Sequence, residues 1–261
     1  MAITDLKAHF AGGGKAVNGW CAIPSAVTAE IMARQGFDLM TVDLQHGLID
    51  YQMALTMVQV LQGLPAPVLA RVPWNEPSIL MKCLDAGFSG VICPMVNTAE
   101  DARRLVQSTR YAPLGSRSFG PTRANMVYGT GYAKAANASV MVLAMIETRE
   151  ALDNLDAILA VEGIDGVYVG PSDLGLSLGY EPTLEPTAPE VLQAIAAIVT
   201  RSKAAGRIAG IHTGSPMMIR QMLAQGYDFA SLLTDVRLFA TAVAAQLAAV
   251  RQTTAEVVKG Y

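Results

Sequence analysis

The chain has 261 residues, a formal net charge of −3 at pH 7 and 52% hydrophobic residues, which is ample material for a large buried core. Its 19 Lys and Arg residues are scattered, so the charge pattern excludes the basic footprint of a nucleic-acid-binding protein. No apolar run approaches the roughly 18 residues of a membrane span, and the polar first turn lacks the apolar segment of a signal peptide. We expect neither membrane insertion nor export.

The three cysteines point to a reducing environment. Cys21, Cys83 and Cys93 are odd in number, sit in apolar stretches and show no CxxC spacing. This pattern argues against disulfides and against zinc ligation. We therefore expect a cytoplasmic protein.

Short apolar runs alternate with helical patterns along the whole chain. The runs that resemble strands are Val17–Pro24, Phe37–Asp43, Pro67–Val72, Gly90–Pro94, Val140–Ile146, Gly166–Val169, Ile208–His212 and Tyr227–Leu233. The helical candidates between them are Ala26–Gln35, Tyr51–Leu61, Pro77–Ala86, Ala99–Ser108, Ala151–Ala160, Pro189–Ala205, Pro216–Gln225 and Val236–Arg251. Several of these helices end in a glycine directly before the next strand, as in Gln35-Gly36-Phe37.

This alternation predicts one (β/α)8 barrel over residues 1–261, because such barrels repeat a strand and a helix eight times in about 250 residues. The alternative is an open, doubly wound sheet. Its usual GxGxxG motif is missing, and Gly12-Gly13-Gly14 precedes the first strand instead of following it.

Three segments depart from a plain barrel. Tyr111–Tyr132 is a long stretch without a clear period, and we interpret it as a lid over the barrel mouth. Gly179–Pro189 is a second long connection with three prolines. The last helix, Val236–Val250, is apolar on several sides, so we expect it to pack on another subunit as well as on its own barrel. The alternative is a terminal helix buried within the monomer.

Two carboxylates end consecutive predicted strands. Glu147 follows Val140–Ile146, and Asp173 follows Gly166–Val169. A right-handed crossover makes these strands parallel, so both acids should lie at one edge of the sheet. Because a buried carboxylate is costly unless it is compensated, a shared hard cation is the expected partner. Alternatively, Glu147 caps the following helix and Asp173 stabilises a turn.

Other polar residues at strand ends suggest enolate chemistry on a 2-oxo acid. A cation held by two acids leaves room for the substrate's carboxylate and ketone oxygens and would polarise the ketone. Arg71 is suited to stabilise the oxyanion or to bind the carboxylate. His46 is the best candidate for the base, and Asp43 three residues earlier could orient its imidazole. No lysine ends a predicted strand and no serine occupies a nucleophile elbow, which disfavours imine and triad chemistry.

The motifs together resemble the HpcH/HpaI family of metal-dependent pyruvate aldolases, in the phosphoenolpyruvate/pyruvate superfamily of barrels. The matching blocks are Gly19-Trp20, Asp43-Leu-Gln-His46, Ala70-Arg71-Val, Val91-Ile-Cys-Pro-Met, Ile146-Glu147 and Val169-Gly170-Pro171-Ser172-Asp173-Leu. This resemblance implies a divalent metal on Glu147 and Asp173, with Mg²⁺ or Mn²⁺ expected and Co²⁺ or Zn²⁺ possible.

The resemblance also implies individual roles. Asp43 and His46 form the catalytic pair, Arg71 binds the oxo group, and the backbone around Gly170, Pro171 and Ser172 contacts pyruvate. Trp20 and Asp173 belong to the substrate site, and Asp85 matches an acid of the family that supports the site. The family forms hexamers, trimers of dimers that exchange their last helix, which would explain the apolar Val236–Val250.

The chain departs from the family at several positions. Gln45 stands where many members have glutamate, and Met145 stands where they have glutamine. His212 replaces a common leucine or phenylalanine, and we expect it to line the aldehyde pocket and favour hydroxylated acceptors. The Asp43 to Tyr51 block is most similar to the hydroxypyruvate/pyruvate aldolase branch. These differences affect which substrate is expected, but they do not change the expected reaction class.

The predicted function is reversible cleavage of 4-hydroxy-2-oxo acids to pyruvate, or hydroxypyruvate, and an aldehyde through a metal-stabilised enolate. The first alternative is a decarboxylase or another carbon–carbon lyase that uses the same enolate. The second is a metabolite-binding oligomer without activity, in which His46 and Arg71 would be superfluous.

Overall fold

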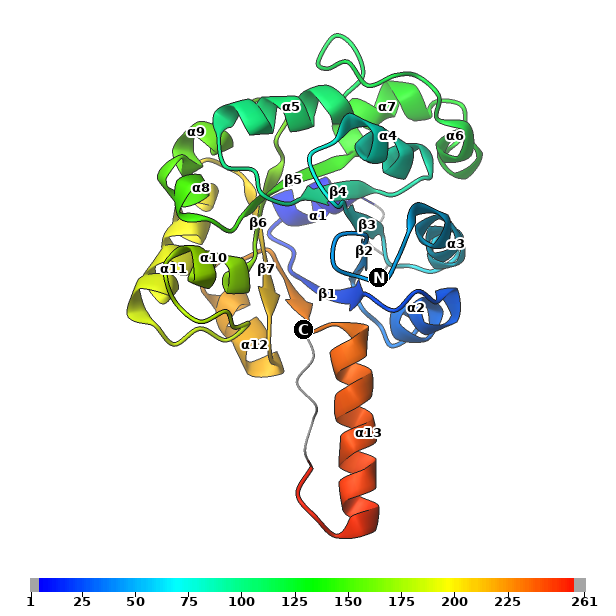
Figure 1. Cartoon of the computed structure of the whole chain (residues 1–261). Coiled ribbons are helices and arrows are strands. Elements are labelled where there is room, and N and C mark those ends of the chain that lie inside the picture. The colour runs from blue at the N-terminus through cyan, green and yellow to red at the C-terminus, as the bar shows by residue number, and fades with distance from the viewer. Residues whose placement is uncertain (1–4, 256–261) are drawn as a thin grey trace.

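Eight parallel strands close into a barrel in the computed structural model, which describes residues 5–255 (Figure 1). The strands follow one another around the barrel in chain order, and β1 closes against β8. They are β1 Ala16–Cys21, β2 Leu39–Asp43, β3 Val68–Arg71, β4 Gly90–Cys93, β5 Met141–Ile146, β6 Gly166–Val169, β7 Ile208–Thr213 and β8 Phe229–Leu232. The predicted (β/α)8 barrel is confirmed.

Helices surround the strands (Figure 1). They are α1 Leu6–Ala11, α2 Ala26–Ala33, α3 Tyr51–Leu61, α4 Pro77–Asp85, α5 Ala99–Thr109, α6 Thr122–Tyr128, α7 Tyr132–Ser139, α8 Arg149–Asp153, α9 Leu155–Leu159, α10 Pro171–Ser177, α11 Pro189–Ala204, α12 Pro216–Ala224 and α13 Asp235–Arg251. Many begin with the expected caps. Thr98, for example, forms a complete capping box with Asp101 at the start of α5.

The predicted elements match the structure closely, with informative differences. Gly36, Gly87, Gly206 and Gly226 adopt φ between 67° and 112° where a helix turns into the next strand. The predicted helix Ala151–Ala160 is broken at Asn154 into α8 and α9. The short helices α1, α6, α7 and α10 were not predicted, because segments of 6 to 8 residues show little amphipathic periodicity in a sequence.

Alternation along the strands divides the core into two separate clusters. The inward-facing residues, among them Trp20, Leu69, Met145 and Phe229, form a cluster inside the barrel, which Leu6 and Phe10 complete. The residues between them on the same strands, such as Val42 and Ile146, pack outward against the helices in the larger cluster. Since the side-chain period of a strand is two, this register also fixes which polar residues face the lumen.

The segment Tyr111–Tyr132 does not cover the mouth of its own barrel, so the lid prediction is wrong for this chain. Arg117 pairs with α4, and Tyr128 Oη donates to the Gly87 carbonyl at 2.8 Å, beyond the last turn of α4. Gly87 precedes β4, so the segment lies on the amino-terminal side of the barrel. The physical reason is that α6 forms within it and packs against α4.

Helix α13 projects away from the barrel (Figure 1). Its first residue, Asp235, is buried and accepts the Ala22 amide at 2.8 Å, which ties the helix to the end of β1. Farther along, Phe239 is 68% exposed and Val250 is 82% exposed. Within residues 5–255, none of the helices combines the length and the apolarity that crossing a membrane requires.

Candidate active site

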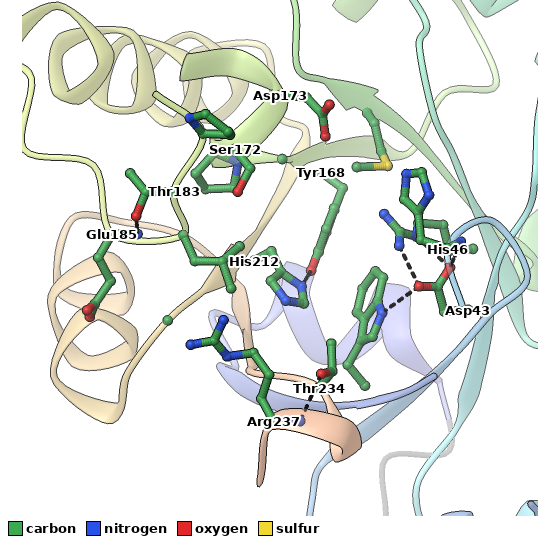
Figure 2. A pocket seen from close by; sticks show the side chains of 18 residues that line it. Asp43, His46, Tyr168, Ser172, Asp173, Thr183, Glu185, His212, Thr234 and Arg237 are labelled. Carbon is green, nitrogen blue, oxygen red and sulfur yellow. Dashed lines mark hydrogen bonds and ion pairs between the residues drawn. The ribbon is translucent and has the colours of Figure 1, made fainter. Parts of the chain in front are cut away.

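A pocket of about 450 Å³ opens at the carboxyl ends of the strands (Figure 2). It is lined by Trp20, Asp43, His46, Arg71, Met145, Tyr168, Gly170, Pro171, Ser172, Asp173, Pro182, Thr183, Leu184, Glu185, His212, Gly214, Thr234 and Arg237. The barrel register therefore brings the predicted residues of strands one, two, three, six and seven to one cavity. Glu147 ends β5 beside it, against Gly170.

Asp43 and Arg71 form a buried clamp at the base of the pocket. They are register partners on β2 and β3, so their side chains enter the lumen side by side. Arg71 Nε donates to Asp43 Oδ1 at 2.8 Å and Nη2 donates to Oδ2 at 2.5 Å. Burial alone would raise the pKa of Asp43, but the guanidinium and these hydrogen bonds hold the pKa of this carboxyl below its ordinary value. The pair thus fixes a permanent cation in the pocket wall.

His46 sits on an exposed turn at the lip of the pocket. Asp43 Oδ1 accepts the backbone N–H groups of Gln45 and His46, at 3.0 and 3.2 Å. Gly47 completes the turn, because a Cβ there would meet the Asp43 carbonyl at 2.2 Å. Asp43 is therefore linked to His46 through the backbone that carries the imidazole.

Glu147 is a buried acid with incomplete compensation. Its Oε1 accepts the Met95 N–H at 2.8 Å, and a Cβ on Gly170 would lie 2.6 Å from its Oε2. The pKa of Glu147 is raised to about 7, chiefly by burial and also by the nearby Asp173, while the Met95 amide and Arg71 act in the opposite direction. Two acids this close favour a cation between them.

The donor set fits a hard divalent cation. Glu147 and Asp173 offer carboxylate oxygens, which Mg²⁺ and Mn²⁺ prefer. Within residues 5–255, no group of three or more His, Cys, Asp and Glu side chains could hold a metal ion. A cation bound here would therefore take its remaining ligands from water and substrate.

The backbone beside these acids is shaped for an anion. Gly170 precedes α10, and Pro171, Ser172 and Asp173 form its first turn without a side-chain cap on Gly170. Backbone N–H groups in the first turn of a helix have no partner within the helix. Figure 2 shows Ser172 and Asp173 together on one side of the pocket.

His212, Trp20 and Tyr168 make up the inner wall. The His212 and Trp20 rings meet edge to face with centroids 4.8 Å apart, and Trp20 stacks on Tyr168. Trp20 Nε1 donates to Asp43 Oδ2 at 3.2 Å, so this wall is tied to the clamp. Burial, together with the charge of Arg71, lowers the pKa of His212 to about 3, while Asp43 acts in the opposite direction.

The outer rim contains residues that the sequence did not reveal. Pro182, Thr183, Leu184 and Glu185 come from the long connection after α10, and Arg237 comes from the first turn of α13. Figure 2 places Glu185 and Arg237 on the side of the pocket opposite His46. Tyr168 was also missed, although strand alternation after Gly166 could have found it.

Asp85 lies outside the pocket of its own chain. It is at the end of α4, where its Oδ1 accepts from Arg117 Nη2 at 2.6 Å. Arg117 in turn stacks over Tyr111, with its guanidinium carbon 4.4 Å from the ring centroid. Within the described subunit, Asp85 makes this structural contact with Arg117, and its role in supporting the active site stays a prediction from the family resemblance.

The fold and the site together define a class. Paired acids, a fixed guanidinium and a histidine at the mouth of a parallel barrel are suited to breaking carbon–carbon bonds next to a carbonyl group.

Comparison with known proteins identifies the family. The model of the HpcH/HpaI aldolase/citrate lyase family matches residues 19–242. A hydroxypyruvate/pyruvate aldolase of Rhizorhabdus wittichii is 44% identical over 230 residues, which cover 88% of this chain and 92% of that protein. A 4-hydroxy-2-oxo-heptane-1,7-dioate aldolase of Escherichia coli is 35% identical over 244 residues, 92% of each chain. The crystal structure of an HpcH/HpaI aldolase/citrate lyase family protein from Burkholderia cenocepacia superposes with a TM-score of 0.88 at 29% identity, over 94% of this chain and 98% of that one.

The chain belongs to the HpcH/HpaI aldolase/citrate lyase family, and it is a carbon–carbon lyase of the aldolase type. The family depends on a divalent metal ion. The resemblance drawn from the sequence motifs is confirmed.

Proposed function

We propose that this enzyme reversibly cleaves 4-hydroxy-2-oxo acids to pyruvate, or hydroxypyruvate, and an aldehyde, with Mg²⁺ or Mn²⁺ held by Glu147 and Asp173. The observation that carries the proposal is the undercompensated acid pair at the same rim as Arg71 and His46. The names of the relatives from Rhizorhabdus wittichii and Escherichia coli support the same substrate class.

The residues of the chain divide the work of the reaction. A bound cation would supply Lewis acidity at the ketone. Arg71, held by Asp43, stabilises the C2 oxygen as it gains negative charge. His46 takes the proton from the C4 hydroxyl as the C3–C4 bond breaks, and a proton is then returned to C3 of the enolate. The backbone N–H groups of Ser172 and Asp173 in the first turn of α10, which have no acceptor within the helix, bind the substrate carboxylate.

The assembly and location are also proposals. We propose a homohexamer, a trimer of dimers that exchange α13, and the support is the exposed apolar face of that helix, including Phe239, Val243 and Leu247. Light scattering of the wild type and of Phe239→Glu measures the state, and a hexameric Phe239→Glu would contradict this use of the helix. A cytoplasmic location rests on the three free cysteines.

The test is pyruvate release from a panel of 4-hydroxy-2-oxo acids, coupled to lactate dehydrogenase. We expect release from at least one compound, its loss with a chelator, and its recovery with Mg²⁺ or Mn²⁺. Release that is insensitive to a chelator would contradict the metal assignment. The absence of release with every compound and metal would contradict the aldol reaction.

A second candidate is a decarboxylase or another carbon–carbon lyase that forms the same enolate. It is favoured by the likeness to a structure described as citrate synthase SbnG, with a TM-score of 0.85 and 27% identity over 95% of this chain and 98% of that one. Carbon dioxide release from oxaloacetate, measured beside the aldol assay, ranks the two reactions. A decarboxylation rate above every aldol rate would favour the second candidate.

A further inference from the structure

A chain of hydrogen bonds runs from the pocket down into the barrel lumen. His212 Nδ1 lies 3.2 Å from Tyr168 Oη, and Tyr168 Oη lies 2.6 Å from Ser231 Oγ. Ser231 Oγ lies 2.8 Å from the side-chain amide of Asn18. Figure 2 shows the first of these contacts, with the His212 ring beside the Tyr168 hydroxyl. We call these four residues the lumen relay. Tyr168, Ser231 and Asn18 are fully buried.

The Asn18 amide sets the direction of the lumen relay. One end of this amide faces the backbone carbonyls of Gly19 and Leu39, at 3.2 and 3.0 Å. Carbonyl oxygens only accept hydrogen bonds, so the amide nitrogen must occupy that end. The amide oxygen then faces Ser231 Oγ, and Ser231 is the donor in this pair.

Each hydroxyl has a single proton, so the direction propagates toward the pocket. Ser231 gives its proton to Asn18 and must accept from Tyr168. Tyr168 gives its proton to Ser231 and must accept from His212. Any other arrangement would place two lone pairs against each other inside the barrel, where an unpaired polar contact is costly. His212 therefore carries its proton on Nδ1.

We infer that His212 presents Nε2 to the pocket as a hydrogen-bond acceptor and thereby selects substrates that carry a hydroxyl group. His212 lines the pocket, and its hydrogen bond within the protein uses Nδ1, so Nε2 is the nitrogen left for a ligand. The edge of Trp20 fixes the plane of the ring. Its low pKa keeps the imidazole neutral, so it accepts a hydrogen bond without taking the proton.

This inference rests on the proposed aldolase function and adds a substrate class to it. A hydroxyl on the aldehyde, next to its carbonyl carbon, or the hydroxyl of hydroxypyruvate could make the contact. A carbonyl in the same position would face Nε2 with lone pairs and would be rejected. A methyl group would leave Nε2 without a partner.

The experiment compares three aldehydes that differ in one group: 2-hydroxypropanal, 2-oxopropanal and 2-methylpropanal, each condensed with pyruvate. In the wild type we expect kcat/KM to favour the hydroxyl over both others by about 10- to 100-fold. In His212→Leu this preference should fall to within about 3-fold. In Ser231→Ala, Tyr168 loses its acceptor and donates to Nδ1, so Nε2 becomes a donor and the discrimination against 2-oxopropanal should disappear.

A second arm tests the other source of the hydroxyl. Hydroxypyruvate and 2-oxobutanoate, which differ by a hydroxyl and a methyl group, are compared as donors in the wild type and in His212→Leu. A preference that falls in this arm alone assigns the hydroxyl to the donor. Unchanged ratios in both arms would overturn the inference.

Thr213→Val is the matched control, because it removes a neighbouring buried hydroxyl that donates to the Ser231 carbonyl at 2.8 Å and is outside the lumen relay. It should leave all the ratios unchanged. The tautomer itself is read from ¹⁵N spectra of the imidazoles, which are simple because the chain has 3 His residues. Protonated Nε2 in wild-type His212 would overturn the inference even if a variant fails to fold. Failure of the proposed function is separate: the wild type would then not exchange the methyl protons of pyruvate with deuterated water.

Discussion

The two ends of the barrel each contain a buried acid, but the acids differ in how well their charge is compensated. The acid at the amino-terminal end is paired with a basic side chain, and the acid at the carboxyl end is not. At the amino-terminal end, the Asp228 carboxylate accepts hydrogen bonds from Lys203 Nζ at 2.7 and 2.8 Å and from the Ala209 N–H at 2.9 Å. On the same side of the barrel, the partly buried Asp165 accepts a hydrogen bond from Arg110 Nη2 at 2.7 Å. Each of these acids connects a helix to a strand and is paired with a basic side chain.

At the carboxyl end, Glu147 accepts a hydrogen bond from the Met95 N–H and lies near a second acid, Asp173. The backbone differs in the same way. At the amino-terminal end the positive φ angles that precede strands belong to glycines, whereas Met95 and Leu233, which follow β4 and β8, have φ of 54° and 46°. Backbone strain and a carboxylate with too few partners thus occur at the end of the barrel where a bound ligand can compensate for them. Acids of the same kind therefore serve stability where basic groups and hydrogen-bond donors compensate their charge, and they can bind a ligand where that compensation is incomplete.

The largest expected effect comes from Glu147→Gln, which removes the undercompensated charge. We expect activity to fall by at least about 10³-fold, because the Lewis acid would be lost. The melting temperature should not fall, since glutamine fits the space and needs no cation. Metal analysis after gel filtration checks the cause, with Asp228→Ala as the control that keeps its metal. Full metal occupancy in Glu147→Gln would remove the distinction between the two ends.

His46→Ala tests the proposed base at the lip of the pocket and leaves the acids at both ends of the barrel in place. The loss of a general base lowers the rate by about 10²–10⁴-fold and leaves ground-state binding nearly intact. The rate of aldol cleavage should therefore fall, while the affinity for pyruvate, measured by calorimetry, should stay nearly unchanged. A wild-type rate would show that the base is elsewhere.

Asp228→Ala tests the opposite end. The change leaves the Ala209 amide and the Lys203 ammonium without their acceptor, so the free energy of unfolding should fall by about 2–3 kcal/mol. Urea denaturation measures it, and kcat of the folded fraction should be unchanged. A stable but inactive variant would mean that this end also contributes to the chemistry.

The last expected effect is a pH dependence of the stability of the metal-free protein. The pKa of Glu147 is raised from 4.5 to about 7, so the folded state binds a proton more tightly than the unfolded chain. Stability from this group is complete below pH 4.5 and is lost as the pH rises toward 7, by about 1.4 kcal/mol per unit. Urea titrations of the wild type and Glu147→Gln between pH 5 and 8 isolate it. Parallel curves would show that Glu147 is compensated after all.

Much of the site was predictable because a barrel turns sequence order into position. Glu147 and Asp173 could be brought together from two strand ends, and Asp43, His46 and Arg71 followed from the same rule. The position of Asp85 relative to the pocket could not be predicted from periodicity, because Asp85 sits where a helix ends and its orientation depends on packing with Arg117.

The connections were harder to predict, for a related reason. The length of Tyr111–Tyr132 suggests a lid, but its helix α6 packs against α4 instead. The rim includes Thr183 and Glu185, which lie in the proline-rich connection Gly179–Pro189, where the sequence has no periodic signal. Arg237 was hidden in an apolar helix whose first turn reaches the pocket.

The division of the hydrophobic core into a cluster inside the barrel and a cluster under the helices has a consequence for protein engineering. Residues of the inner cluster alternate with those of the outer one along every strand, so a mutant library can be restricted to inward positions such as Met145, Tyr168 and His212. Such a library would sample new substrate preferences while leaving the shell of helix contacts, and most of the stability it provides, untouched.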